Sequence, residues 1–210
     1  MSELKKRISK GEGVHLDFKF RVDDQAKIAR TLSAFSNSNG GSLLIGVKDS
    51  GKISGCNPEE EYYMLEGAAE LYCSPSISIT SKVWKEGHHL VLEVEVPPSE
   101  VRIKARDENG KWLPYYRIDD HSVKSNRVLD ILWKMSKEVP CRPEKFTEEE
   151  IKLLKYIHEY GPVTISKLNR LTKLGFNELS SLLASLVHWE VINLMIDDEG
   201  LRYFSGDIID

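Results

Sequence analysis

The stretch TLSAFSNSNGGSLLIGVKDSGKISG, residues 31–55, decides the fold of the chain around it. Just before and within it, Ile28, Leu32 and Phe35 follow the i, i+4, i+7 spacing of one helix face. The Asn-Gly-Gly at 39–41 ends this helix, because glycine tolerates the left-handed conformation of a helix C-cap. We expect a short buried strand over 42–47 and a tight turn at 49–51. The stretch therefore predicts a helix, a strand and a hairpin in close succession.

The same stretch contains part of a phosphate-loop pattern. Residues 46–52, GVKDSGK, fit G-x-x-x-x-G-K, but Ile53 stands where a magnesium-binding Ser or Thr is needed. A phosphate loop also opens directly into a helix. Here residues 52–54 are typical of the return arm of a hairpin, and the next helix begins near Pro58. We therefore expect no ATP binding through this loop and no required cofactor.

Composition points to a globular protein without a membrane segment. The 210 residues are 40% hydrophobic and 30% charged, which suits one large or two small domains. No apolar run approaches the roughly 20 residues of a membrane helix, and no apolar segment follows the charged N-terminus. We expect a cytoplasmic protein with no membrane partner. Its three cysteines lack C-x-x-C spacing, so neither a disulfide framework nor a zinc site is predicted.

Periodicity divides the first part of the chain into strands and helices. Leu90, Leu92, Val94 and Val96 are predicted to share one strand face, with Glu93 on the other. Asp23 is expected to cap a helix over 23–35. Further helices are expected at 58–72 and 122–137, and strands at 14–21, 77–84, 89–96, 101–106 and 112–118. The prolines at 140 and 143 mark the domain boundary, which gives domains 1–140 and 144–210.

The second domain is predicted to contain three helices and a hairpin, which resembles a winged helix-turn-helix. The helices are expected at 147–158, 165–171 and 176–189, and the hairpin strands at 191–196 and 201–204. Residues 144–210 carry 7 Lys and Arg against 12 Asp and Glu, and the expected recognition helix has no cation. Because phosphate contacts supply much of DNA affinity, the acidic wing turn at 197–199 opposes DNA binding. Two roles stay open: DNA contact through Lys167, Arg170 and Lys173, or dimerisation through a Leu/Trp189 surface.

Three segments together resemble the Schlafen AlbA-like domain family. They are E-x(4)-D-F-K from Glu12, the AFSNSNGGSLLIGVKDSGKISG block, and WLPYYRIDDHSVK at 112–124. The resemblance spans about residues 8–127. It implies an α+β protein, with an AlbA-like α/β domain followed by the small winged-helix domain, and DNA or RNA as partner.

The resemblance also implies candidate catalytic residues. Glu12, Asp17 and Asp49 match the three carboxylates with which the nuclease branch of the family binds a divalent metal and cuts RNA. Such oxygen ligands suit magnesium or manganese. Lys19, on the same strand face as Asp17, is a candidate phosphate contact. A structural role is the alternative, since Asp is common in turns and this chain has one AlbA-like lobe where the nuclease branch has two.

Cations on one strand supply the candidate nucleic-acid surface. Arg102, Lys104 and Arg106 alternate along residues 101–106 and lie roughly 6.5–7 Å apart, close to the phosphate spacing of a single strand. Arg117 and Lys124 extend this stripe. Tyr115 or Tyr116 is a candidate for base stacking, and a basic arm is formed by Lys5, Lys6, Arg7 and Lys10. An ordinary solvated edge strand is the alternative.

These observations predict a nucleic-acid-binding protein, a DNA-binding transcriptional regulator that uses the basic strand. Two alternatives remain: a metal-dependent endoribonuclease of the Schlafen type, and an adaptor that forms homodimers through the winged helix.

Overall fold

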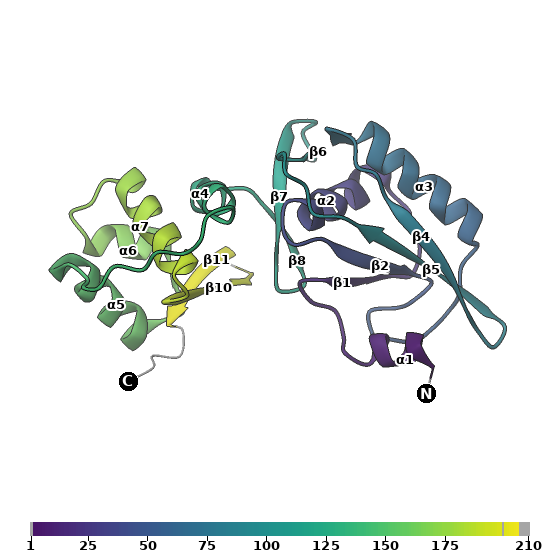
Figure 1. Ribbon diagram of the computed structural model, residues 1–210, viewed down its shortest axis with the longest axis horizontal. Helices are drawn as coiled ribbons and strands as arrows, with labels where there is room; N and C mark the ends of the chain where they lie inside the picture. The colour runs from purple at the N-terminus through teal and green to yellow at the C-terminus, as the bar shows by residue number, and fades with distance from the viewer. Residues whose placement is uncertain (1, 199, 206–210) are drawn as a thin grey trace. The chain divides into compact units, whose positions relative to one another are not determined.

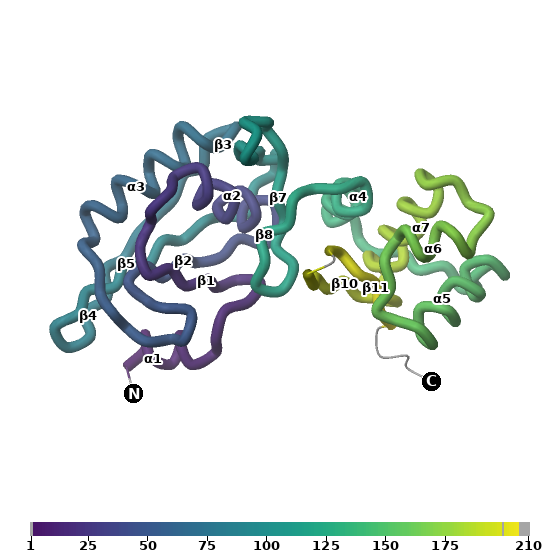
Figure 2. Tube along the Cα trace, turned by 180° about the vertical axis from the view of Figure 1, so that it is seen from behind, coloured from purple at the N-terminus to yellow at the C-terminus, as the bar shows by residue number. Residues whose placement is uncertain are grey.

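The chain divides into two compact units, residues 1–125 and 126–210, in a computed structural model that describes residues 2–198 and 200–205. Each unit has an apolar core of its own. The elements can be followed in Figures 1 and 2. In the described part of the chain, no helix is long and apolar enough to cross a bilayer. The α+β fold class predicted from sequence is confirmed.

The first unit contains two four-stranded sheets. One sheet has the order β1-β2-β5-β4, with β1 parallel to β2 and the other pairs antiparallel. The other has the order β3-β6-β7-β8 and is antiparallel throughout. The strands are β1 Leu16–Lys19, β2 Gly41–Ile45, β3 Cys73–Ser74, β4 Thr80–Glu86, β5 His89–Val96, β6 Lys104–Arg106, β7 Trp112–Ile118 and β8 His121–Lys124.

Three helices cover these sheets: α1 Glu3–Ile8, α2 Gln25–Ser36 and α3 Pro58–Leu71. Helix α2 packs against α3, β6 and β7 (Figure 1), and Leu32 and Phe35 are fully buried there. Leu4 and Ile8 of α1 pack in a separate cluster against residues such as Phe18 of β1. The N-cap of α2 is Asp24 and not Asp23, because the Asp24 carboxylate accepts hydrogen bonds from the amides of Ala26 and Lys27.

Polar residues at the end of α2 connect the helix to the second sheet. The amide nitrogen of Asn37 donates to the carbonyl oxygens of Ile103 (2.7 Å) and Tyr115 (3.0 Å), and its oxygen accepts from the Ile103 N–H (2.8 Å). Ser36 donates to the Pro97 carbonyl, and Ser38 accepts from the Arg117 N–H. These side chains satisfy backbone groups that would otherwise be buried without partners.

Glycine completes the same connection. Gly40 has φ of +71°, and a Cβ there would lie 2.8 Å from the Val96 carbonyl oxygen. The hairpin expected after β2 is also present, because Lys48 and Lys52 are joined by a backbone hydrogen bond and Gly51 has φ of +76°. The serine, asparagine and glycine residues of the 31–55 stretch thus act mainly on the backbone of their own unit.

One predicted helix has the wrong bounds, and the burial of Glu93 was not predicted. Glu93 does not face solvent: it is 2% exposed, accepts a hydrogen bond from the Trp84 indole (2.6 Å) and forms an ion pair with Arg7 of α1. Residues 121–124 form β8 and not a helix. The next helix, α4 Arg127–Met135, is capped by Asn126 and packs against a helix of the second unit. Helix α4 belongs to the compact unit of residues 126–210.

The second unit combines four helices with a three-stranded sheet among its described residues. Besides α4, the helices are α5 Glu148–Tyr160, α6 Ile165–Leu171 and α7 Phe176–His188. The sheet has the order β10-β11-β9, from β9 Val163–Thr164, β10 Ile192–Asp197 and β11 Gly200–Ser205. The expected helices and hairpin are present, and β9 was not predicted. Trp189 is partly buried and packs against this unit's core.

Candidate nucleic-acid interface

The hairpin formed by β6 and β7 presents two exposed cations on one strand face. Lys104 and Arg106 are both exposed, while Ala105 between them is fully buried. Neither cation has an ion pair with any residue that the structure describes. The guanidinium of Arg106 lies over the indole ring of Trp112, 4.9 Å from the ring centre, and the two residues are paired across the strands. Aromatic and cationic groups are therefore adjacent on this surface.

Asp107 fixes the shape of this hairpin. Its carboxylate accepts hydrogen bonds from the backbone N–H groups of Asn109 (2.9 Å) and Lys111 (2.8 Å) and from the ammonium group of Lys124 (3.0 Å). The Lys111 amide and the Lys124 ammonium hold the pKa of the Asp107 carboxyl below its usual range. The turn is consequently a stiff support for the cations on either side of it.

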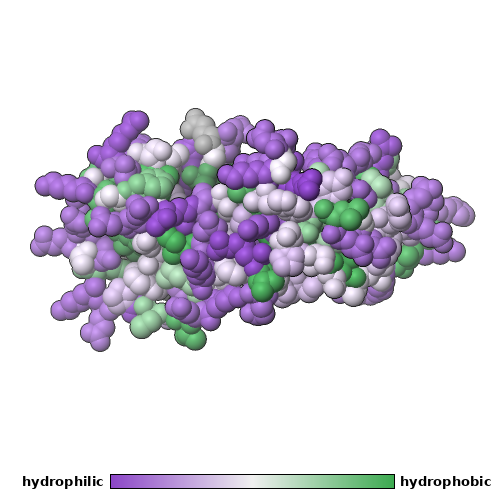
Figure 3. All heavy atoms as spheres, turned by 90° about the horizontal axis from the view of Figure 1, so that it is seen from above, coloured by the Kyte–Doolittle hydropathy of each residue, from purple (hydrophilic) through white to green (hydrophobic). Residues whose placement is uncertain are grey.

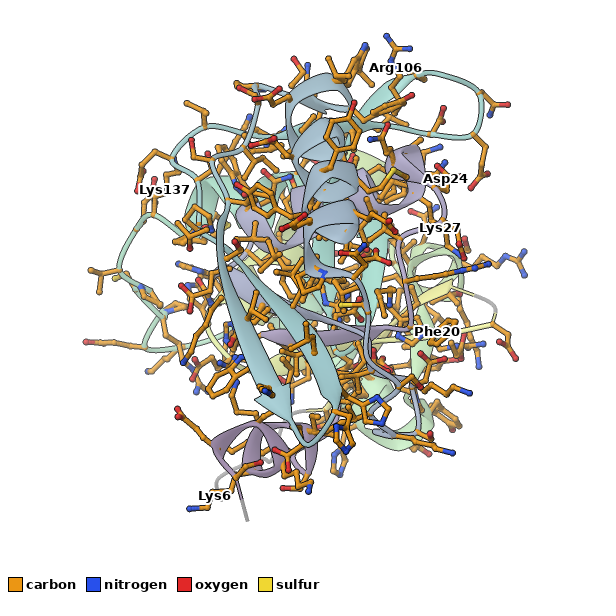
Figure 4. All side chains as sticks on the ribbon, turned by 90° about the vertical axis from the view of Figure 1, so that its right-hand side faces the viewer. Lys6, Phe20, Asp24, Lys27, Arg106 and Lys137 are labelled. Atoms are coloured by element: carbon orange, nitrogen blue, oxygen red, sulfur yellow. The ribbon has the colours of Figure 1, made fainter. Side chains whose placement is uncertain are left out.

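Helix α2 contributes a further cation beside β6. The Arg30 guanidinium donates to the Arg106 carbonyl oxygen (3.0 Å) and pairs with Glu108 at 2.7 Å. In Figure 4, Arg106 and Lys6 lie at opposite ends of the view of this unit. The N-terminal cations consequently do not extend the β6 surface. Two of them are also engaged: Lys5 with Glu86 (2.7 Å) and Arg7 with Glu93.

Arg117 is in the interior and not on the predicted basic stripe. Its side chain is 2% exposed and donates to Asp17 (3.2 Å), the Gly13 carbonyl (3.0 Å) and Ser122 (3.2 Å). Its guanidinium also lies over the ring of Phe35, 4.7 Å from the centre. Tyr115 and Tyr116 are buried as well, at 5% and 6% exposure. These three residues are structural, because both faces of β7 are covered and strand alternation no longer separates core from solvent.

The other predicted cations divide between paired and partly buried. Lys19 forms an ion pair with Asp17 at 2.7 Å, and Lys124, half exposed, pairs with Asp107. Arg102 is half-buried and makes an interaction of its own within the protein. Of the six predicted nucleic-acid-binding residues, Lys104, Arg106 and Lys124 are exposed, and of these Lys104 and Arg106 have no ion pair with a described residue.

The acidic candidates occupy two different settings. The Glu12 carboxyl neighbours the Asp17 carboxylate, and Glu12 accepts a hydrogen bond from the Phe18 N–H at 2.8 Å. Burial raises the pKa of the Glu12 carboxyl, and the neighbouring Asp17 carboxylate adds to this rise. Asp49 is exposed in the turn at 49–51 and lines an open groove of about 570 Å³ with Ile8, Phe18 and other residues. Only two of the three carboxylates are in contact.

The arrangement does not fit a divalent metal. Among the described residues, no group of three or more His, Cys, Asp or Glu side chains is close enough to hold an ion. The Asp17 carboxylate is instead neutralised by Arg117 and Lys19, on its two oxygens. Two cations on one carboxylate compensate its buried charge, which is the usual requirement for an acidic side chain in the interior.

A protein-family model described as Schlafen, AlbA_2 matches residues 12–126 of the 210-residue chain. The chain belongs to this family. The family resemblance read from the three sequence segments is thereby confirmed. The AlbA_2 domain contains both the β6–β7 hairpin and the Glu12–Asp17 pair.

Other comparisons are more distant. No curated protein sequence matches the chain. The DIP2311 protein from Corynebacterium diphtheriae is 15% identical with a TM-score of 0.44; the match covers 90% of this chain and 34% of that protein, so the chain spans about a third of it. The N-terminal domain of a RecG-related protein from Nitrosomonas europaea is 21% identical with a TM-score of 0.41, over 56% of this chain and 88% of that domain.

Sequence reasoning missed two residues of the AlbA_2 hairpin. Trp112 and Asp107 were not selected as site residues, although one places an aromatic ring under Arg106 and the other orders the turn. The signal was present in the D-E-N-G turn at 107–110. An antiparallel hairpin closed by this turn pairs the residue before it, Arg106, with Trp112 after it.

Proposed function

We propose that this protein binds nucleic acid with the outer face of its β6–β7 hairpin. Membership in the AlbA_2 family suggests nucleic-acid binding in general, and the hairpin supplies a surface suited to it. The observation that carries the proposal is the pair of exposed, unpaired cations Lys104 and Arg106, with Trp112 beside them. Cations on alternate residues of one strand lie roughly 6.5–7 Å apart, close to the distance between successive phosphates of a single strand.

The charge around the β6–β7 hairpin supports nucleic-acid binding there, whereas the net charge of the chain does not. The chain as a whole has a formal charge of −4, so long-range attraction to a polyanion is absent. Around the hairpin, however, five cations face two carboxylates: Arg30, Lys104, Arg106, Lys111 and Lys124 against Asp107 and Glu108. Binding there displaces counterions from phosphates, and the affinity therefore falls as salt increases.

The test is a salt titration of binding to labelled DNA and RNA with a charge-reversed hairpin. Lys104→Glu with Arg106→Glu is expected to lower affinity at least tenfold near 0.1 M salt and to reduce the slope of log K against log salt by roughly 1.4–1.8. Lys82→Glu is the matched control, because Lys82 is also an exposed strand cation over an indole ring, 3.6 Å from the centre of Trp84. Equal binding by both variants and the wild type would overturn the proposal.

We propose that the second unit is a winged-helix domain and that the protein acts as a DNA-binding transcriptional regulator whose DNA contacts lie away from α7. The helices α5, α6 and α7 precede a β-hairpin, as in winged helix-turn-helix proteins. Helix α7, in the position of a recognition helix, has no Lys or Arg, and Asp197 and Asp198 lie at the turn of the hairpin. We therefore propose that this unit does not read DNA through α7 and its hairpin.

Homodimerisation is the second proposal for this unit, with sedimentation equilibrium as its test. On the face that Figure 3 displays, apolar side chains lie in small groups among hydrophilic ones. A large exposed apolar patch, which obligate dimers usually bury, is not visible among the described residues of that face. We expect a dimer to appear as a concentration-dependent mass.

Metal-dependent RNA cleavage has less support than binding. Asp17 is held by two internal cations, and the described acidic residues do not form a metal-binding group. We expect RNA to remain intact when incubated with clean protein and manganese. Cleavage that disappears in Asp17→Asn while the protein stays folded would establish the nuclease function instead.

A further inference from the structure

Most of the positive charges of residues 144–210 lie on α5, α6 and the turn that follows α6. Residues 144–210 contain 7 Lys and Arg against 12 Asp and Glu. Five of those cations belong to this region: Lys152, Lys155, Lys167, Arg170 and Lys173. Helix α7 contains none. An anionic partner of this acidic unit is therefore attracted to the α5–α6 side.

A groove of about 420 Å³ lies among these cations, between α5 and residues 171–173 at the end of α6. Figure 2 shows α5 and α6. Leu153, Tyr156 and Leu171 form its apolar part, and Lys152, Lys155 and Lys173 line it as well. The ammonium group of Lys167 lies 5.9 Å from the centre of the Tyr156 ring. A groove of this volume is large enough for one flat aromatic ring system.

Two carboxylates line the same groove and limit its charge. They are Glu149, in the first turn of α5, and Glu159. The Glu159 carboxylate accepts a hydrogen bond from the Tyr160 hydroxyl, which raises the pKa of Tyr160. Three lysines against two carboxylates, with Lys167 beside Tyr156, leave the groove with a positive balance. The partner must therefore combine an apolar flat group with negative charge.

We propose that this α5–α6 groove binds an unpaired nucleotide, with the base against Tyr156 and the neighbouring phosphates on Lys152, Lys155 and Lys173. The inference rests on the nucleic-acid binding proposed for the hairpin, and it adds a second contact and a class of strand. Aromatic side chains that stack on bases, next to lysines that track the backbone, are the combination by which proteins bind single strands. A base inside a duplex has no free face, so the groove favours single-stranded or unpaired segments.

A nucleic-acid strand is favoured over an acidic peptide as the occupant. The hairpin of the first unit also presents unpaired cations and an aromatic ring, Lys104, Arg106 and Trp112. Each nucleotide of a strand supplies both a flat apolar group and a negative charge, whereas a peptide must provide the two from different residues. The absence of cations on α7 further removes the usual alternative surface of such a unit.

The experiment compares three ligands by fluorescence anisotropy with the full chain. They are a labelled single strand, the same strand as a duplex, and the same strand with abasic sites. Lys152→Ala with Lys155→Ala, and separately Tyr156→Leu, are expected to weaken single-strand binding roughly 5- to 100-fold. Asn177→Ala with Ser181→Ala on α7 is the matched control, since both of its residues are exposed. The lysine variant changes exposed side chains only, so its folding is not at risk.

The abasic strand identifies the role of the base. The wild type is expected to bind the abasic strand less tightly than the intact strand. The Tyr156→Leu variant is expected to bind the two strands with equal affinity. A strand carrying 5-iodouracil is expected to cross-link to the peptide that contains Tyr156. Cross-linking to α7 residues instead would overturn the proposal.

The outcomes separate this inference from the proposed function. If the hairpin variant loses binding and the groove variants bind as the wild type does, the inference is wrong and the proposed function stands. If the wild type binds neither DNA nor RNA, both are wrong. Equal affinity for duplex and single strand also refutes the inference. Self-association of the wild type that only the groove variants abolish would show a protein contact in its place.

Discussion

The substitution Arg117→Met tests whether Arg117 stabilises the fold or contacts nucleic acid. Sequence analysis had placed this residue on the basic binding surface. The Arg117 side chain is 2% exposed and donates to Asp17, to Ser122 and to the Gly13 carbonyl. Methionine fills most of the space but leaves the Asp17 carboxylate without this partner. Breaking a buried ion pair in this way costs about 3–5 kcal/mol.

The expected loss lies at the lower end of that range. Lys19 remains 2.7 Å from the second oxygen of Asp17, is one-third exposed, and continues to compensate its charge. We therefore expect Arg117→Met to lower the free energy of unfolding by about 3 kcal/mol. For a unit of 125 residues this corresponds to a fall in Tm of roughly 10 °C. Urea unfolding and thermal melting followed by circular dichroism measure both quantities.

Two variants make the result decisive. Arg106→Met removes an exposed guanidinium and is expected to change the free energy of unfolding by less than about 0.5 kcal/mol. Asp17→Asn added to Arg117→Met removes the uncompensated charge and is expected to recover at least about 1 kcal/mol. The reasoning is refuted if Arg117→Met is as stable as Arg106→Met yet loses nucleic-acid binding, because Arg117 would then contact the ligand.

Three further outcomes are expected. Asn37→Ala removes three hydrogen bonds to backbone groups of Ile103 and Tyr115, of which the Ile103 carbonyl still accepts from the Ser33 hydroxyl. It is expected to cost about 3 kcal/mol in urea unfolding, whereas the exposed Asn39→Ala costs little; equal effects would contradict this. Because the native pKa of Glu12 lies above its ordinary value near 4.5, the native state binds more protons than the unfolded chain, and Glu12 makes stability fall as pH rises through that window. The Glu12→Gln variant keeps an acceptor for the Phe18 N–H but cannot titrate. Between pH 5 and neutrality its free energy of unfolding is therefore expected to fall less than that of the wild type. A steeper fall than in the wild type would contradict the raised pKa of Glu12. Burial raises the pKa of the Cys73 thiol to about 12. A thiol reagent is therefore expected to modify the exposed Cys141 at once and Cys73 only in denaturant. Rapid modification of Cys73 in the native protein would show that the core opens.

The sequence was sufficient for the elements whose signals are local. Glycine at positive φ, as at Gly40 and Gly51, and the spacing of Leu32 and Phe35 fix a turn or a helix face without reference to distant residues. The capping box of α5, from Thr147 to Glu150, is a signal of the same kind. For this reason the helices α5, α6 and α7 were predicted within a few residues of their observed bounds.

Exposure could not be predicted in the same way. Alternation along a strand assigns two faces, but it does not say which elements cover them. Glu93 was placed on the face opposite the apolar one, and α1 brings Arg7 to that face and buries the carboxylate. Residues 122–124 were assigned to a helix; their pairing with β7 is a contact between strands that no local pattern reports. Both results depend on partners supplied by another element.

The same distinction decides which cations can bind a partner. The first unit places several of its basic side chains in ion pairs with its own carboxylates: Lys5 with Glu86, Arg7 with Glu93, Lys19 and Arg117 with Asp17, Arg30 with Glu108, and Lys124 with Asp107. A phosphate that approaches one of these must compete with a carboxylate already in contact. At Lys104 and Arg106 it replaces only water and dissolved counterions, and release of those counterions favours binding. The binding surface therefore follows from which charges the fold leaves uncompensated, and the number of basic residues in a segment does not determine it.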